Sequence, residues 1–256
     1  MSGDQVVITS IDAGIARLTL NRPDKRNALN DALIAALSDG LRTADADTSV
    51  RVVIITGAGK DFCSGADLSA LQKIARASVS DNVEDARALL QLFLLIRKLR
   101  VPVIAAVRGR ALAGGCGLAT ACDLVVASAS ARFGYPEVKI GFVPAMVMAI
   151  LRRNLPEKRA FEMITRGIEV DAIEATQMGL INQVFADETF EDDVRDYAST
   201  FTKLSASAIT LSKQLLYQMD GQTLREGLSA GLDINVIARM TEECQQGIAR
   251  FLKKEK

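Results

Sequence analysis

Apolar residues recur along the first half of the chain at the spacings of strands and helices. Residues 6–11 and 15–20 alternate apolar and polar positions around the turn "DAG", which predicts a β-hairpin. Residues 28–44 repeat leucine and alanine every three or four positions, which predicts an amphipathic helix. The mainly apolar stretches "VRVVIITG" (50–57) and "VPVIAAV" (101–107) predict strands that are buried on both faces, as in a parallel sheet.

The alternation continues to the middle of the chain and then gives way to helices. A long amphipathic helix is predicted over 82–100, ended by Pro102. A short helix over 115–121 and a strand over 123–128 follow the second apolar run. From about Pro156 the pattern is mainly helical, with one strand near 181–185 and three apolar-periodic helices at the end. The sequence therefore predicts an α/β core followed by a helical C-terminal region.

Composition and charge narrow the class of protein. The 256 residues suit one large domain or a domain with an appendage. Lysine plus arginine and aspartate plus glutamate balance at 31 each, which argues against a nucleic-acid or anionic-membrane surface. The longer apolar stretches are interrupted by Arg108, Arg110 or Arg152 before they could span a bilayer. The first ten residues, "MSGDQVVITS", lack a cationic apolar leader, so we expect a cytoplasmic protein.

Histidine and cysteine usage restricts the chemistry. The chain has no histidine, which excludes Ser-His-Asp and Cys-His catalysis, the HExxH zinc site and any histidine base. Cys63, Cys116, Cys122 and Cys244 show no CxxC spacing, so we expect reduced, packed thiols and no metal site. Acid–base chemistry must therefore rest on carboxylates, lysines, tyrosines or thiols.

One segment, "GRALAGGCGLATACD" (109–123), consists mostly of small residues and directly follows a predicted buried strand. It fits neither phosphate-binding glycine loop: Gly115 stands where Walker A needs lysine, and a GxGxxG reading that starts at Gly115 ends in Thr120. Close packing of strand and helix and close approach of a ligand to bare backbone both remain possible explanations of this segment alone.

A second segment, "GKDFCSGADL" (59–68), also follows a buried strand, places small residues at a turn and opens a helix. Two such turns after neighbouring parallel strands bring free backbone N–H groups to one edge of the sheet. Helix-start N–H groups have no intrahelical partner and lie at the positive end of the dipole. Two of them directed at one oxygen make an oxyanion hole.

With these segments the chain resembles the enoyl-CoA hydratase/isomerase, or crotonase, family over essentially its whole length. The matching stretches are "LTLNRPDKRNAL", "GAGKDFCSGADL", "VIAAVRGRALAGGCGLATACDLVVAS" and "ARFGYPEVKIGFVPA", in the family's order and spacing. The resemblance implies a crotonase-like spiral of ββα turns with acyl-CoA thioester substrates. It implies an acyl-CoA-binding core over 1–200 and a helical oligomerisation region over 201–256, which builds homotrimers or hexamers. Coenzyme A is part of the substrate, so no separate cofactor is expected.

The resemblance also assigns catalytic positions. Ala66 and Gly114 match the two oxyanion-hole donors, although tight packing is the alternative reason for small residues there. Two-glutamate hydratases read "GGGCE" where this chain reads "AGGCG", so the first glutamate position holds Gly117. The second is kept as Glu137, which we expect to act alone as acid and base. In an apolar pocket its pKa should lie above the ordinary value.

Substrate-binding positions follow in the same way. The family binds coenzyme A through backbone around "KRNAL" and "GADL", which here gives Lys25, Arg26, Ala28, Asp67 and Leu68, besides Ala66. For Asp67, capping of a helix start is the preferred alternative to a catalytic role. Tyr135 is a candidate for the acyl pocket, with a packed aromatic as the alternative. Asp123 is expected to be a hydrogen-bonded structural acid, and Phe142, Met146 and Met148 either line the acyl pocket or fill the core.

Two classes of function remain open at this point. The first is an acyl-CoA enzyme that hydrates a 2-enoyl-CoA or moves its double bond through a thioester enolate. The missing first glutamate favours an isomerase or a specialised hydratase or lyase, whereas the family's most common activity is hydration. The second is an inactive acyl-CoA- or RNA-binding relative. Retention of Ala66, Gly114 and Glu137 argues against lost chemistry, and the balanced charge argues against RNA.

Overall fold

A six-stranded sheet lies at the centre of the computed structural model, which describes residues 5–67, 72 and 76–254. Along the sheet the order is β1-β2-β3-β4-β6-β9. The first two strands form the predicted antiparallel hairpin, and every other neighbouring pair is parallel. The strands are β1 (Val7–Asp12), β2 (Ile15–Leu20), β3 (Val52–Gly57), β4 (Val103–Val107), β6 (Leu124–Ser128) and β9 (Gln183–Phe185).

A second, three-stranded sheet has the order β5-β7-β8, where β5 is Arg110–Leu112, β7 is Arg132–Gly134 and β8 is Glu169–Asp171. β7 runs parallel to β5 and antiparallel to β8. The sequence pattern did not predict these strands, because three residues are too few to show a period of two.

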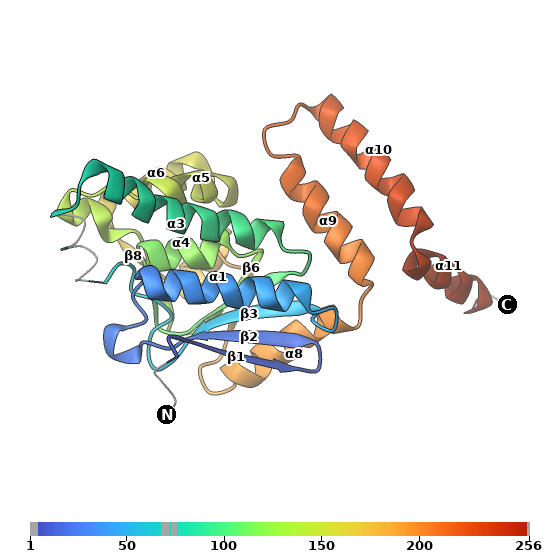
Figure 1. Ribbon diagram of the computed structural model, residues 1–256, viewed down its shortest axis with the longest axis horizontal. Helices are drawn as coiled ribbons and strands as arrows, with labels where there is room; N and C mark the ends of the chain where they lie inside the picture. Colours follow the sequence, from blue (N-terminus) through green and yellow to red (C-terminus); the bar gives the residue numbers. More distant parts are fainter. Residues whose placement is uncertain (1–4, 68–71, 73–75, 255–256) are drawn as a thin grey trace.

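Helices cover both faces of the large sheet (Figure 1). α1 (Asp31–Ala46), α3 (Val79–Lys98) and α4 (Gly114–Ala121) lie over one face, and α8 (Phe190–Thr202) lies under the other. Alternate residues of β3 point to opposite faces of the sheet. Val53 packs in the main core, and Ile54 packs with α8 in a smaller cluster on the other face. A strand covered on both faces in this way is expected to be mostly apolar, as β3 is over residues 52–55.

Three further helices and two 3-10 turns complete the body. The helices are α5 (Ala145–Asn154), α6 (Glu157–Arg166) and α7 (Ala172–Gln177), and the turns are η1 (Pro23–Lys25) and η2 (Pro136–Ile140). The helix expected after residue 66 falls mostly outside the described residues. Within the described part of the chain, no helix is both long and apolar enough to cross a membrane.

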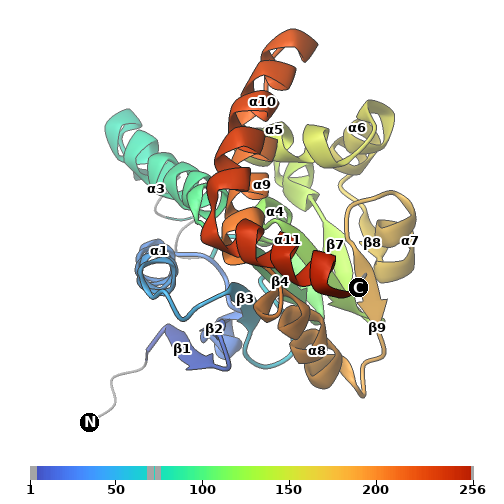
Figure 2. The ribbon, with the colours of Figure 1, turned by 90° about the vertical axis from the view of Figure 1, so that its right-hand side faces the viewer.

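The C-terminal helices extend away from the body (Figures 1 and 2). They are α9 (Ala206–Gln218), α10 (Leu224–Met240) and α11 (Glu242–Lys254), in agreement with the three predicted helices. A buried cation holds α9 against the body: Nζ of Lys213 donates to Asp123 at 2.6 Å and to the carbonyls of Ile96 and Val101 at 2.9 Å.

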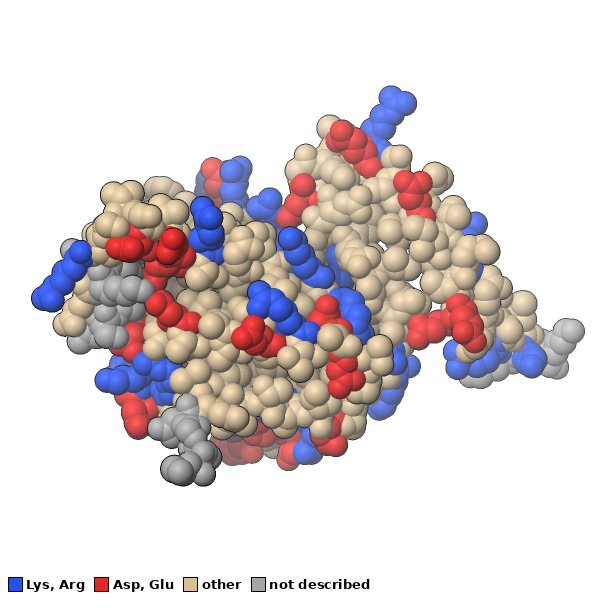
Figure 3. Space-filling view, viewed as in Figure 1, with Lys and Arg blue, Asp and Glu red and all other residues tan. Residues whose placement is uncertain are grey.

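Acidic and basic side chains are interspersed on the face seen in Figure 3. They form no extended patch of one sign there. This distribution agrees with the balanced overall charge of the sequence.

Candidate active site

Backbone hydrogen bonds fasten the two small-residue turns to each other. β3 and β4 are parallel neighbours, so the segments that follow them leave the same edge of the sheet. The amide of Cys63 donates to the carbonyl of Arg110 at 3.0 Å, and the amide of Leu112 donates to the carbonyl of Cys63 at 3.0 Å. The turn that ends at Ala66 therefore lies alongside β5 and the start of α4, as the sequence predicted.

The amide of Ala66 is directed away from its bridging partner. Ala66 forms a parallel bridge with Leu29, in which the Leu29 amide donates to Gly65 at 2.7 Å and the Asp67 amide donates to Leu29 at 3.2 Å. In such a bridge the central residue's own N–H points to the other side. Ala66 is exposed, and within the described residues its amide has no hydrogen-bond acceptor.

The amide of Gly114 is the first of α4 and therefore lacks an intrahelical acceptor. The residue before it, Ala113, has φ 51° and ψ −127°, a region that alanine rarely adopts. Ala113 is held there because its amide donates to Gly134 at 2.8 Å and its carbonyl accepts from Gly117 at 2.9 Å. Such strain costs on the order of 1–3 kcal/mol and is concentrated at functional sites.

The turn that carries Ala66 lies against the start of α4. A Cβ placed on Gly65, the residue before Ala66, would lie 3.5 Å from the nitrogen of Gly114. In the described part of the chain neither the Ala66 amide nor the Gly114 amide has a protein acceptor. Two free N–H groups directed at one oxygen make an oxyanion hole.

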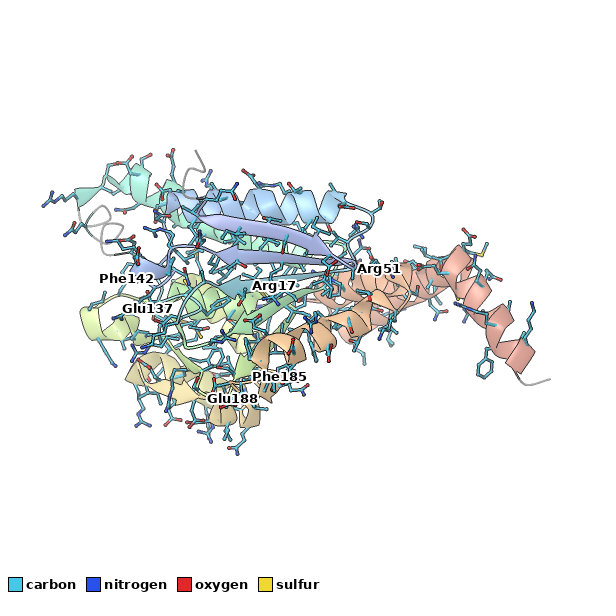
Figure 4. The ribbon with its side chains drawn as sticks, turned by 90° about the horizontal axis from the view of Figure 1, so that it is seen from below. Arg17, Arg51, Glu137, Phe142, Phe185 and Glu188 are labelled. Atoms are coloured by element: carbon cyan, nitrogen blue, oxygen red, sulfur yellow. The ribbon has the colours of Figure 1, made fainter. Side chains whose placement is uncertain are left out.

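The small sheet connects the segment of Glu137 to β5, which precedes α4. β7 pairs with β5, so Gly134 lies opposite Leu112, and Glu137 follows three residues later in η2. Oε2 of Glu137 is buried, and the described residues provide it with no hydrogen-bond partner. Desolvation raises the pKa of this carboxyl above its ordinary 4.5. In Figure 4, Glu137 and Phe142 lie near each other at the end of the molecule away from α10 and α11.

Tyr135 lies beneath the site rather than in its wall. Its side chain is 0% exposed, and its hydroxyl is 3.1 Å from Oγ1 of Thr120 on α4. Because the Thr120 hydroxyl donates to the carbonyl of Cys116 at 2.9 Å, its oxygen accepts the Tyr135 proton. Tyr135 therefore ties the segment of Glu137 to α4, and the packed-aromatic alternative describes it better than a substrate contact.

The first glutamate position of the two-glutamate hydratases is closed. A Cβ on Gly117 would lie 2.2 Å from Cγ1 of Val147 on α5 and 3.3 Å from Cζ of Phe93 on α3. Neighbouring side chains fill the place of the missing carboxylate, and nothing in the sequence indicated that Val147 does so.

The segments expected to bind coenzyme A are brought together. The amide of Ser64 donates to the carbonyl of Arg26 at 3.0 Å, next to the bridge between Leu29 and Ala66. Arg22, which sequence reasoning missed, forms a 2.6 Å ion pair with the buried carboxylate of Asp67. This pair fastens the two segments and gives Asp67 a structural role; the helix that it was expected to cap falls outside the described residues.

The other predicted residues are distributed around these segments. Lys25 and Arg26 are exposed and Ala28 is buried, while Leu68 falls outside the described residues. Asp123 is the hydrogen-bonded acid that was expected: besides Lys213, it accepts from the amide of Val103 at 2.7 Å. Among the described residues no group of three or more histidine, cysteine, aspartate or glutamate side chains could hold a metal ion.

The apolar side chains expected near the acyl group differ in exposure. Phe142 and Met148 are 47% and 38% exposed, whereas Met146 packs against the main core.

Asn27 is a further structural residue that the sequence did not reveal. Its side-chain amide donates to the carbonyls of Ala58 and Asp61 and joins the η1 loop to the turn after β3.

Comparison with known proteins agrees with this architecture. The family model described as enoyl-CoA hydratase/isomerase matches residues 10–256. The 2,3-dehydroadipyl-CoA hydratase of Escherichia coli is 36% identical over 249 residues, which cover 97% of this chain and 96% of the relative. The mitochondrial enoyl-CoA hydratase domain-containing protein 3 of Danio rerio is 33% identical over 258 residues, which cover 100% of this chain and 89% of the relative.

Solved structures share the fold. An enoyl-CoA hydratase from Mycobacterium smegmatis superposes with a TM-score of 0.93 at 32% identity, covering 97% of this chain and 96% of that one. Human enoyl Coenzyme A hydratase domain-containing protein 3 superposes with a TM-score of 0.92 at 29% identity, covering 98% of each chain. The two sheets and the helical C-terminal region are therefore those of crotonase structures.

Proposed function

The chain belongs to the enoyl-CoA hydratase/isomerase family and acts on acyl-CoA, and from that premise we propose that it hydrates a 2-enoyl-CoA with Glu137 as its single acid–base group. The proposal rests on two observations of the described residues: the amides of Ala66 and Gly114 have no protein acceptor, and a buried carboxylate oxygen of Glu137 has no hydrogen-bond partner. A thioester oxygen accepts from both amides, and the acyl carbons then lie within reach of Glu137.

Hydration proceeds in two proton transfers through one carboxyl group. The Glu137 carboxylate takes a proton from water while the water oxygen bonds to the β-carbon of the enoyl group. The electrons of the double bond move onto the α-carbon and the thioester oxygen, where the two amides stabilise the enolate. Glu137 then returns the proton to the α-carbon, so one water has been added and the carboxylate is restored.

Double-bond migration is a second candidate, favoured by the closed position at Gly117. Val147 and Phe93 make the space next to Gly117 apolar, and isomerisation needs no water. Glu137 removes a proton from the α-carbon of a 3-enoyl-CoA, the oxyanion pair holds the dienolate, and Glu137 delivers the proton to the γ-carbon. Both reactions use the amides of Ala66 and Gly114 and the carboxyl group of Glu137.

Coenzyme A lies, on this proposal, along the paired segments 25–28 and 66–68. Their backbone is held in place by the contact between Ser64 and Arg26 and by the ion pair between Arg22 and Asp67. Lys25 and Arg26 are exposed on this edge and provide positive charge for the phosphates.

We further propose that the helices after residue 201 join copies of the chain into a trimer or a hexamer. Leu224, Leu228, Leu232 and Val236 recur every four residues along α10 and are 81%, 67%, 66% and 54% exposed. An apolar stripe of this length on one helix is typical of an interface. A second copy of the chain carries the same stripe on its α10, so the stripes of two copies can pack against each other and bury these side chains.

The test is incubation of the protein with crotonyl-CoA and, separately, with a 3-enoyl-CoA. Loss of the conjugated thioester absorbance reports hydration, and its gain reports isomerisation. Glu137→Gln should abolish turnover in either assay and still bind CoA thioesters. Turnover that is unchanged in Glu137→Gln would remove Glu137 from this role, and binding without any turnover by the wild type would indicate an inactive acyl-CoA-binding relative.

A further inference from the structure

Gly117 lies on α4, three residues after Gly114, and residues at this spacing share a face of a helix. It also stands at the first glutamate position of the two-glutamate hydratases. A side chain at position 117 would extend towards Val147 on α5 and Phe93 on α3.

Val147 occupies the space that a side chain at position 117 would fill. Its Cγ1 would be 2.2 Å from a Cβ on Gly117, a separation that real Cβ atoms do not adopt, and its side chain is buried. Valine in a helix has one strongly preferred rotamer, so the methyl group cannot simply turn aside. Phe93, with Cζ 3.3 Å from the same point, closes the space from the α3 side.

We propose that Val147 is a specificity-determining residue of this site. Its side chain excludes a second carboxylate, and the water that it would hold, from the space that a side chain at position 117 would fill, so all proton transfer passes through Glu137. The proposal rests on the proposed acyl-CoA reaction. Beyond that reaction, the proposal assigns to Val147 on α5, which is far from Gly117 in the sequence, the role of preventing a second carboxylate from entering the site.

A stability experiment tests the contact without reference to activity. Alanine is favoured over glycine inside a helix, so Gly117→Ala alone should raise the Tm if the space is free. The contact with Val147 predicts instead that Gly117→Ala lowers the Tm in the wild-type background and raises it in a Val147→Ala background. Val194→Ala is the matched control: Val194 is a buried valine of α8 in the smaller cluster, and its loss should leave the effect of Gly117→Ala negative.

An activity experiment tests the consequence for the reaction. Gly117→Glu should lose both stability and crotonyl-CoA hydration while Val147 is present. In Gly117→Glu/Val147→Ala, kcat/KM for hydration should exceed that of Gly117→Glu by about tenfold or more, because a second carboxylate then shares the proton transfers. The pH profile of the double variant should also gain a second ionisation that the wild type lacks.

Either of two results would overturn the proposal. One is a Gly117→Ala effect on the Tm with the same sign with and without Val147. The other is a double variant that is no more active than Gly117→Glu. Failure of the proposed function is distinguishable from both, because it shows in the wild-type background, either as absent hydration or as hydration that does not depend on Glu137, whereas the Tm experiment needs no activity.

Discussion

The Cβ of Ala113 lies 2.7 Å from the point where a Cβ would stand on Gly65. These residues immediately precede Gly114 and Ala66, so each proposed oxyanion-hole amide belongs to a residue whose preceding neighbour contacts the other turn. Gly65 has φ +93° and Ala113 has φ 51°, so both turns adopt the left-handed side of backbone space. The spacing of the two amides is thus set by a contact that permits no side chain at position 65.

Gly65→Ala should disturb this spacing. The new Cβ meets Ala113 and is 3.0 Å from the carbonyl of Leu112, and alanine is disfavoured at this φ. We expect a loss of about 1–3 kcal/mol in the free energy of unfolding and a larger fractional loss of kcat than of substrate binding. Denaturant unfolding measures the free energy of unfolding, and steady-state kinetics measures kcat and KM. Gly247→Ala, where a Cβ meets no atom within 4 Å, is the control; equal behaviour of the two variants would refute the spacing argument.

Gly114→Pro removes the oxyanion N–H and keeps the backbone position. Proline is tolerated at the first residue of a helix, where Gly114 stands. We expect kcat/KM to fall by about 10²–10³-fold, the cost of one lost oxyanion donor. Gly114→Ala retains the N–H, and its Cβ meets only a terminal methyl of Leu29, at 3.2 Å. Far-UV circular dichroism checks that both variants fold, and similar losses in both would contradict the role of the amide.

Glu137→Gln should stabilise the protein near neutral pH while abolishing its activity. Burial raises the folded-state pKa of Glu137 above 4.5, so the folded state binds the proton more tightly than the unfolded state. Wild-type stability therefore falls, relative to Glu137→Gln, as the pH rises from 4.5 through the folded pKa. Below 4.5 the glutamate is neutral in both states and the difference should vanish. Urea unfolding of both proteins across this range checks the sign; a difference that grows as the pH falls would be inconsistent with a buried carboxyl.

Leu228→Asp combined with Leu232→Asp should dissociate the oligomer. Both leucines are about two-thirds exposed on α10 in the single chain, so the charges cost little to the fold of the monomer. In a subunit interface, however, they would be desolvated without partners. Sedimentation velocity should show trimers or hexamers for the wild type and monomers for the double variant. A wild type that sediments as a monomer would remove the interface.

The strands and helices that carry the site could be predicted from the sequence where their patterns are long. The alternation of the hairpin, the apolar runs of β3 and β4 and the helical period of α3 were all visible in the sequence. β5, β7 and β8 were missed because three-residue strands show no period, yet β5 and β7 bring Glu137 to α4. Long-range pairing of short segments is decided by the assembled fold rather than by local preference.

The same limit applies within the site. Small residues at 66 and 114 were visible as a pattern, whereas the strained backbone of Ala113 carries no sequence signal. Arg22 and Val147 act through partners 45 and 30 positions away, and neither is part of a local pattern. Tyr135, two residues from Glu137, was a candidate both for the acyl pocket and for a packed aromatic, and the sequence could not show that its hydroxyl contacts Thr120 on α4.

The most direct test of the central claim is a crystal structure with an unreactive CoA thioester bound. The account predicts a thioester oxygen about 3 Å from the nitrogens of both Ala66 and Gly114, with the carboxylate of Glu137 beside the α-carbon. A thioester oxygen bound by other groups, or either amide donating to a protein carbonyl in the complex, would contradict it.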